Sequence, residues 1–464
     1  MHDKVKSRSR RQIPAVSKLL DLLNATDLPR PLIVDCVRKQ LAQEREGSNV
    51  ASPAALVARI RTALAQLHRS RLQDVVNGTG IIIHTNLGRA PLAVEATKTL
   101  GQIGSAYSNL EYDLSAGERG HRGAYIDKAL ALLCGAESAM VVNNCAAALV
   151  LIAQHFIKTK PGVIISRGEI VQIGGGFRIG EILEASGAKL REVGATNKTT
   201  LRDYARAIDS NTAFILKVHR SNFFMDGFVD SPDAKEIGQL ARKKRLPFVV
   251  DLGSGALEST GQFDSAEIEP TPANELKNGA DLVCFSGDKL FGGPQAGIIA
   301  GKKRFVTALK CEPLFRALRC DKLGLAALQA TVDLHLRGAQ SEIPALALLR
   351  ISKDELRSRA AAIIERLRGL PAQINVGRGA VKVGGGTLPR STISSVAIDI
   401  VPNDCSVREF ADRLRALTPP VVGYIANKSF KLDLRTIFPA QDDAVVDAIR
   451  TACTTTPSVD LSNA

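Results

Sequence analysis

The chain has 464 residues, 45% of them hydrophobic and 23% charged, which is typical of a globular protein large enough for two or three domains. The longest apolar run, around Ala146–Ala153, is too short to cross a bilayer, and no apolar segment of a secretory signal follows the charged N-terminus. The eight cysteines form no Cys-x-x-Cys pair, so their spacing argues against a zinc site or a disulfide framework and favours a reduced, cytoplasmic compartment.

The formal net charge is +14, and half of this excess lies in the first 75 residues. That segment holds fourteen Lys or Arg against seven Asp or Glu, which leaves +7. Such an asymmetry favours a polyanionic partner, and nucleic acid is the usual one. A basic, solvated helical surface without a ligand would show the same charge pattern.

The N-terminal residues 12–70 have the apolar spacing of amphipathic helices. Pro29 and Pro31 mark a break, and Ser52 with Pro53 predicts the N-cap and first position of a third helix. We therefore expect a small basic helical domain over residues 1–76.

From Asn77 onward, short apolar runs alternate with amphipathic helical segments. This alternation predicts an α/β domain over residues 77–302 with a mostly parallel central sheet. A different pattern of long helices followed by strands predicts linking helices and a smaller α+β C-terminal domain over residues 303–464. The strands expected in the α/β domain are Ile81–His84, Ala139–Val142, Gly162–Ile165, Ala213–Val218, Pro247–Asp251, Asp281–Phe285 and Gly297–Ala300.

Lys289 lies in the segment Ser286–Gly297, on a tight connection between two predicted core strands. A buried lysine can have a lowered pKa and act as an amine nucleophile. The alternative is an ordinary surface lysine beside a Gly-Pro turn.

Two further segments follow predicted strands, where ligands of parallel sheets bind. Asn143, Asn144, Cys145 and Ala146 open a helix whose exposed N–H groups could cradle a phosphate, although helices that begin with small residues are common. Asp251 ends an apolar strand and needs a partner; a protonated pyridine nitrogen would serve, as would a helix cap or a salt bridge.

Taken together, the order of these features is a phosphate cradle, a carboxylate, and then Ser286 with Lys289. This is the order found in enzymes that use pyridoxal phosphate, where the helix start holds the phosphate, the aspartate the pyridinium and the lysine the aldehyde carbon. The combination is more specific than any of its parts.

Two other segments carry polar residues of functional type. The polar, glycine-containing stretch Ser108–Arg122 is expected to be a functional loop. Arg316 and Arg319 are expected on one face of a helix, where they could hold a phosphate or remain solvated or paired with carboxylates.

Nearly the whole chain resembles the bacterial L-seryl-tRNA(Sec) selenium transferases, or selenocysteine synthases, which are fold-type I pyridoxal phosphate enzymes with an added N-terminal tRNA-binding domain. The motifs that carry this resemblance are Asn77–Gly80, His84–Leu92, Tyr107–Leu114, Gly117–Arg122, Val142–Ala147, Ser166–Glu169, Gly174–Ile179, Gly194–Thr199, Val250–Gly255 and Phe285–Gly297.

The resemblance implies that Lys289 carries pyridoxal phosphate on its amine and that Asp251 binds the pyridinium. It assigns active-site roles to Arg89, Arg316 and Arg319 and to Asp288 beside the lysine. One departure is Cys145, where the family often has Asn, Thr or Ser; it changes a side-chain contact to the cofactor phosphate, not the backbone contacts.

The implied reaction converts L-seryl-tRNA(Sec) to L-selenocysteinyl-tRNA(Sec), by elimination of the seryl hydroxyl and addition of selenium from selenophosphate. The basic N-terminal domain would bind the tRNA backbone. The resemblance also implies a homodecamer built as a ring of homodimers. The alternatives are a related pyridoxal phosphate lyase or transferase acting on a small amino acid or amino-sugar acid, and a catalytically dead tRNA-binding relative.

Overall fold

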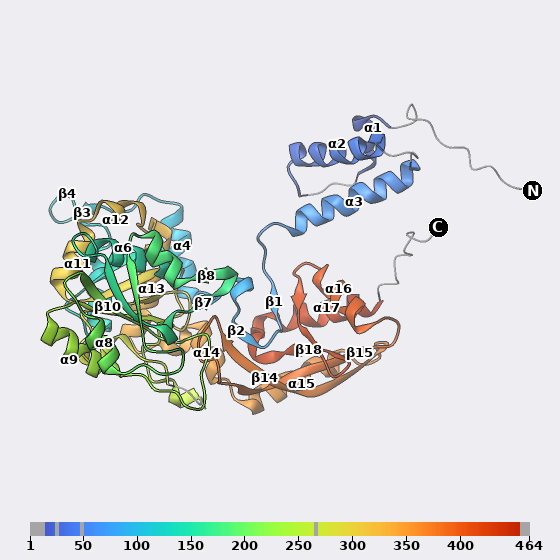
Figure 1. Ribbon diagram of the computed structural model, residues 1–464. Helices are drawn as coiled ribbons and strands as arrows, with labels where there is room; N and C mark the ends of the chain where they lie inside the picture. The colour runs from blue at the N-terminus through green and yellow to red at the C-terminus, as the bar shows by residue number, and fades with distance from the viewer. Residues whose placement is uncertain (1–13, 24–26, 47–50, 264–267, 455–464) are drawn as a thin grey trace, which may run out of the picture. The chain divides into compact units, whose positions relative to one another are not determined.

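The computed structural model describes residues 14–23, 27–46, 51–263 and 268–454 (Figure 1). The chain divides into two compact units: Met1–Val76 with Asp412–Pro420, and Asn77–Ala411 with Val421–Ala464. Within the described residues, no helix combines the length and apolar character that a bilayer span requires. The five cations of residues 4–11 lie outside the described part.

The first unit contains three helices, α1 (Val16–Leu22), α2 (Arg30–Glu46) and α3 (Pro53–Arg69). Leucines, valines and an isoleucine from all three form a separate core that includes Leu19, Leu41 and Ile60. The Ser52 side chain accepts a hydrogen bond from Ala55 N at 3.2 Å, and Pro53 follows it, so α3 begins as the sequence predicts. The described cations of this unit therefore lie on helices, and in the short segment after α3, around a separate apolar core.

A seven-stranded sheet forms the centre of the second unit, in the order β5-β13-β12-β11-β10-β6-β9. Its strands are parallel except β13, which runs antiparallel to both neighbours. The six strands expected between residues 139 and 300 are all present. The edge strand β9 was not predicted, because its charged residues interrupt the apolar pattern. The bounds are β5 (Ser138–Val142), β6 (Gly162–Ser166), β9 (Lys189–Val193), β10 (Thr212–Val218), β11 (Phe248–Gly253), β12 (Leu282–Ser286) and β13 (Gly297–Gly301).

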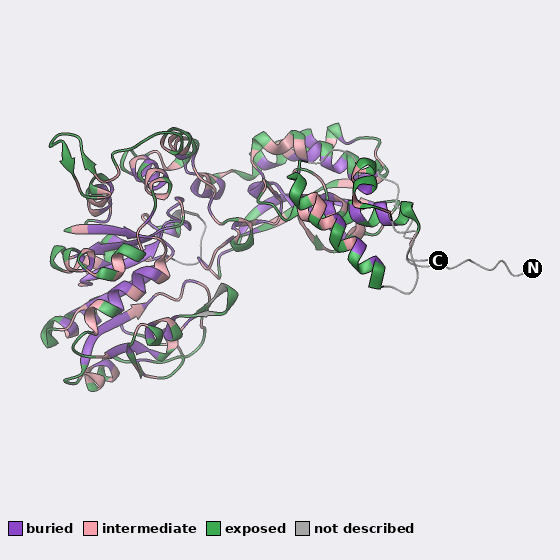
Figure 2. Cartoon of the chain, turned by 90° about the horizontal axis from the view of Figure 1, so that it is seen from above, coloured by how far each residue is buried: buried purple, intermediate pink, exposed green. Residues whose placement is uncertain are grey.

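Helices cover both faces of this sheet, and successive strand residues enter different cores (Figures 1 and 2). Val250 packs on one face with α5, α8, α9 and α13, whereas Val249 packs on the other with α6, α7 and α11. Since side chains alternate along a strand, Asp251 shares the α6 face. These helices are α5 (Ala124–Leu133), α6 (Cys145–Phe156), α7 (Ile179–Ala185), α8 (Leu201–Ala207), α9 (Ala234–Lys244), α11 (Lys303–Lys310) and α13 (Lys322–Leu336).

A second sheet, in the order β17-β18-β15-β14-β2, belongs mainly to the C-terminal part of the chain. Its strands are β2 (Ile81–Ile83), β14 (Ala372–Gly384), β15 (Ile393–Pro402), β17 (Tyr424–Ala426) and β18 (Ser429–Asp433). The strand expected over Ile81–His84 is present as β2, which pairs with β14 of this sheet, Ile81 lying opposite Lys382, and is not part of the large central sheet. A short apolar run shows that a strand forms, not which sheet it joins.

The remaining helices and short strands connect or cover these two sheets. They are α4 (Val94–Gly104), α10 (Pro272–Lys277), α12 (Pro313–Ala317), α14 (Pro344–Arg350), α15 (Lys353–Arg366), α16 (Val407–Arg415), α17 (Asp442–Thr454), β1 (Val76–Asn77), β3 (Tyr112–Asp113), β4 (Glu118–Arg119), β7 (Gln172–Ile173), β8 (Phe177–Arg178) and β16 (Val421–Val422).

Arg435 forms hydrogen bonds that link the second sheet with α14 and the residue after it. Its side chain is 2% exposed and donates to Leu348 O at 3.0 Å, Ile351 O at 2.7 Å and Ser394 O at 3.0 Å.

Arg435→Ala should lower the free energy of unfolding by about 3 kcal/mol, because buried carbonyls lose a charged donor. Urea titration would measure this loss. The control Arg378→Ala, at an exposed position of β14, should change it by less than about 0.5 kcal/mol; equal losses in both variants would contradict the assignment.

Candidate active site

Asp251 lies at the carboxyl end of β11 and is 6% exposed. Its Oδ1 accepts hydrogen bonds from Gly253 N at 3.1 Å and from the Cys145 thiol at 3.6 Å. Burial raises the pKa of Asp251, and the charge of Lys289 offsets part of this rise. Among the described residues it forms no salt bridge and caps no helix, so no cationic group is in direct contact with its carboxylate.

Lys289 lies in the connection between β12 and β13 and is 5% exposed. The neighbouring Leu290 N donates to Ser254 O at 3.0 Å, which holds this connection against the segment after β11. A Cβ built on Gly253 would lie 3.8 Å from Lys289 Nζ and 3.3 Å from Ser221 Oγ, so the amine is directed at backbone that follows Asp251. The alternative of a surface lysine is therefore wrong.

The predicted cradle is the N-terminus of α6, directly after β5. Asn144 is the N-cap, and its Oδ1 accepts from Ala147 N at 2.8 Å, so this side chain serves the helix itself. Cys145 and Ala146 occupy the first two helical positions, where backbone N–H groups have no carbonyl partner within the helix. Asn143 N donates to Leu318 O at 2.9 Å, and Asn143 Oδ1 is buried without a partner. The N–H groups at the start of α6 are thus available to bind an anion.

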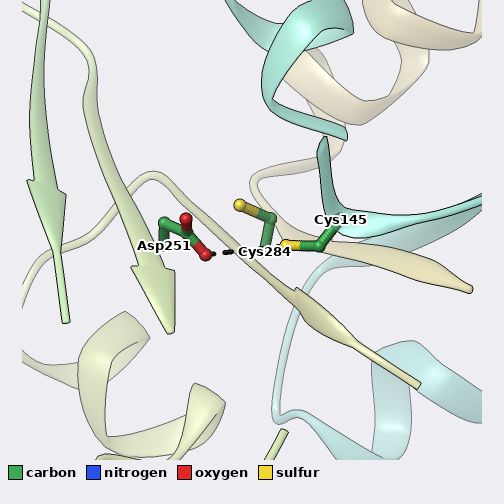
Figure 3. Close-up of side chains that lie close together, drawn as sticks. All are labelled: Cys145, Asp251 and Cys284. Carbon is green, nitrogen blue, oxygen red and sulfur yellow. Dashed lines mark hydrogen bonds between the residues drawn. The ribbon is translucent and has the colours of Figure 1, made fainter. Parts of the chain in front are cut away.

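Cys145, Asp251 and Cys284 converge at this place from three different elements (Figure 3). Cys284 is on β12, in register with Asp251 on the neighbouring strand β11, and both residues face α6. Ser286, which ends β12, is 6% exposed. The cradle, the aspartate and the β12–β13 connection therefore form one site at the carboxyl edge of the sheet.

Asp288 orients Arg89 at the side of the lysine. Arg89 Nη1 donates to both carboxylate oxygens of Asp288, at 3.0 and 2.8 Å. The carboxylate is 8% exposed and the arginine side chain 32% exposed. Ala90 N also donates to Asp288 O, so backbone and side chain together hold this guanidinium beside Lys289.

The expectation that Arg316 and Arg319 share a helix face is wrong, because α12 ends at Ala317 and Leu318 is its C-cap. Arg319 Nη1 lies 3.5 Å from Glu111 Oε1, and Arg316 is exposed. Glu111 also accepts from Arg119 and Arg122, which come from the polar loop that the sequence singled out. The carboxylate of Glu111 thus lies beside three guanidinium groups.

The sequence argument missed a second buried carboxylate, Glu269, which is 2% exposed. Its Oε2 lies 3.1 Å from His219 Nε2, and its Oε1 accepts from Leu388 N at 3.0 Å. His219 follows β10 and donates its backbone N–H to Asp251 O at 2.8 Å. His219 follows a predicted strand, and this position could have identified it as a site residue. The sequence holds no such signal for Glu269, because it lies far from any strand end.

Comparison with known proteins identifies the family of this chain. The L-seryl-tRNA selenium transferase family model matches residues 75–438. The L-seryl-tRNA(Sec) selenium transferase of Geobacter sulfurreducens is 43% identical over 455 residues, which cover 95% of this chain and 98% of that protein. The one from Carboxydothermus hydrogenoformans is 46% identical over 372 residues, 80% of this chain and 79% of that protein. The chain belongs to this family.

The fold expected of a selenium transferase is confirmed as well. The structure of D-glucosaminate-6-phosphate ammonia-lyase matches with a TM-score of 0.58 at 20% identity, covering 84% of this chain and 97% of that chain. This similarity shows the fold alone. The expected family, the fold-type I α/β architecture and the expected transferase class are confirmed.

The residues of the site fit pyridoxal phosphate. The carboxylate of the buried Asp251 has no cation in direct contact within the described residues, the first N–H groups of α6 lie in the cradle, and the amine of Lys289 is buried. A protonated pyridine nitrogen, a phosphate and an aldehyde would complement these groups in turn.

Gly297 keeps the cradle open. A Cβ on this residue of β13 would overlap the backbone carbonyl of Asn144, the N-cap of α6. Gly297→Ala should displace the cradle at a cost of about 1–3 kcal/mol and weaken pyridoxal phosphate binding by about tenfold or more. Titration of cofactor-free protein, followed by the visible absorbance, would measure this. In the control Gly101→Ala the new Cβ on α4 meets nothing within 4 Å; cofactor affinity should not change there, and retained affinity in Gly297→Ala would contradict the role of the glycine.

Proposed function

We propose that this protein converts L-seryl-tRNA(Sec) to L-selenocysteinyl-tRNA(Sec) with selenophosphate, using pyridoxal phosphate. The observation that carries the proposal is a buried lysine beside a buried, unpaired aspartate, in a chain whose relatives of the same length are L-seryl-tRNA(Sec) selenium transferases. The overall change balances: selenium replaces the seryl hydroxyl, and the displaced oxygen is recovered in the phosphate.

Each cofactor-binding residue has a distinct task. The N–H groups of Cys145 and Ala146, with Asn143 and Ser286, would hold the phosphate, and Asn144 would support them by capping α6. Asp251 would bind the ring nitrogen and keep it protonated, since a buried carboxylate favours a cationic partner. Lys289 would bind the aldehyde carbon. The cofactor supplies an electron sink that stabilises negative charge at the seryl Cα.

Lys289 is also suited to move a proton. Once the substrate amine takes its place on the cofactor, the lysine amine is free to accept the proton from the seryl Cα. Because the amine is buried in the β12–β13 connection, water is largely excluded from this step. Loss of the seryl hydroxyl then leaves a carbon to which selenium adds.

The arginines would bind selenophosphate. Arg89 is oriented by Asp288, and Arg319 is held by Glu111 and lies over the ring of Phe315, 5.6 Å from its centroid. Arg316 has no salt-bridge partner among the described residues. Guanidiniums that are already oriented lose little entropy when they bind a phosphate group.

The basic first unit would bind the tRNA. Its positive charge and its independent apolar core support a separate RNA-binding module over residues 1–76. A cytoplasmic location follows from the aminoacyl-tRNA substrate and agrees with cysteines that remain thiols, such as Cys145 and Cys284. A homodecamer built from homodimers is proposed on the family resemblance alone.

A lyase acting on a small amino acid or amino-sugar acid is the weaker candidate. The similarity to the ammonia-lyase is limited to 20% identity and concerns the fold, whereas identity to a selenium transferase reaches 43% along 95% of this chain. A catalytically dead relative is disfavoured because Lys289, Asp251 and the Arg89–Asp288 pair are all in place.

Lys289 should be the residue that carries the cofactor. Borohydride reduction of the loaded protein should add a pyridoxyl group to the peptide that contains Lys289. Lys289→Ala should lose this label and lower turnover of seryl-tRNA by at least about 10²-fold, because both the attachment point and the base are removed. Mass spectrometry and a selenocysteinyl-tRNA assay would measure these effects. Lys303→Ala, at an exposed position of α11, should keep both label and turnover; a label that survives in Lys289→Ala would refute the assignment.

The tRNA-binding role of the first unit predicts a change in salt dependence. Arg38→Gln with Arg69→Gln removes exposed cations from α2 and α3, so tRNA affinity should fall, and the log–log salt slope should decrease by about 0.9 for each tRNA phosphate that the variant no longer neutralises. Filter binding over a range of salt concentrations would measure this. Lys243→Gln with Lys244→Gln removes the same charge from α9 and should leave the slope unchanged; the reverse pattern would place the RNA on the other unit.

A further inference from the structure

Two thiols and a carboxylate meet at the floor of the cofactor site. The ligand atoms of Cys145, Asp251 and Cys284 all lie within 4.8 Å of one another (Figure 3). The two cysteines are 139 positions apart in the sequence, which is why spacing along the chain did not reveal them as a pair. Neither thiol has a task in the proposed reaction, and Cys145 stands where the family often has Asn, Thr or Ser.

The spacing of these atoms fits a tetrahedral metal ion. Two ligands bound to one zinc ion, with Zn–S near 2.3 Å and Zn–O near 2.0 Å, lie about 3.5 Å apart. Cys145 Sγ and Asp251 Oδ1 are 3.6 Å apart. We propose that the cofactor-free protein binds one thiophilic divalent cation, such as Zn²⁺, through Cys145, Asp251 and Cys284, with a water molecule in the fourth position.

Electrostatics favours this occupant. Two thiolates and one carboxylate carry three negative charges, which a divalent cation and the nearby ammonium of Lys289 would neutralise together.

A disulfide is the less suitable use of the same pair. Oxidation proceeds through a thiolate, and redox-sensing cysteines are exposed and acidic. Cys284 is fully buried, so it lacks the exposure that such a cysteine needs. A bound cation stabilises the thiolates directly and needs no oxidant.

The metal and the cofactor would exclude one another, because both need Asp251. This part of the inference rests on the proposed role of Asp251. A chain that takes up a thiophilic cation before its cofactor would be held inactive, and pyridoxal phosphate would protect the loaded protein from the same cation. Competition of this kind is reciprocal by linkage.

The test uses the full-length protein, with and without pyridoxal phosphate. Zn²⁺ is titrated against a chromophoric chelator, and Co²⁺ replaces it to reveal thiolate-to-metal charge-transfer absorption. One ion per cofactor-free chain is expected. Cys145→Ser and Cys284→Ser should each weaken zinc binding by more than about 10- to 100-fold. That range is the usual loss when a residue that only hydrogen-bonds to a metal ligand is replaced. Cys311→Ser, at an exposed cysteine, should bind as the unmodified chain does.

Several results would overturn the proposal: no 1:1 complex, no thiolate-to-cobalt band, or equal losses in Cys311→Ser. Visible absorbance after reloading with pyridoxal phosphate shows that a serine variant has folded, and Cys145→Ser provides a second test should Cys284→Ser not fold. Zinc binding that persists undiminished in the loaded protein would refute the exclusion and the role of Asp251 while leaving the metal site intact.

Discussion

The burial of two opposite charges at neighbouring strand ends is the constraint on which the site depends. Asp251 ends β11 and Lys289 follows β12, its parallel neighbour, yet Asp251 Oδ1 accepts its hydrogen bonds from Gly253 and Cys145. Buried charges without charged partners are costly, and the raised pKa of Asp251 reflects that cost. In the proposed complex, pyridoxal phosphate would offer a cation to Asp251 and an electrophilic carbon to Lys289, and would reduce this cost.

Positive charge exceeds negative charge among the arginines proposed for the site and the carboxylates that hold them. Asp288 binds Arg89 and fixes its direction, and Glu111 lies beside Arg119, Arg122 and Arg319. Together with the exposed Arg316, these five arginines exceed the two carboxylates by about three charges. The carboxylates therefore orient the guanidiniums without cancelling them, which suits a phosphate-containing donor.

The sequence predicts those parts of the site that follow strand ends. Asp251, Lys289 and the start of α6 were found because each comes directly after an apolar run, and parallel strands bring such residues to one edge. The local sequence pattern does not predict which residues contact one another across the sheet. The register that sets Cys284 beside Asp251, the pairing of Ile81 with Lys382, and the end of α12 before Arg319 all depend on tertiary packing, which a local pattern does not record.

Cys145 contributes to the site through its backbone and, separately, through its thiol. The groups available to an anion at the start of α6 are backbone N–H groups, which any residue supplies, and Asn144 caps the helix with its own side chain. The proposed phosphate contacts would therefore be the same with another residue at position 145. The thiol adds a second sulfur beside Cys284 and Asp251, and a soft ligand set in a buried, anionic place selects for thiophilic cations. The proposed metal site therefore depends on the thiol of Cys145, whereas the proposed phosphate contacts depend on the backbone.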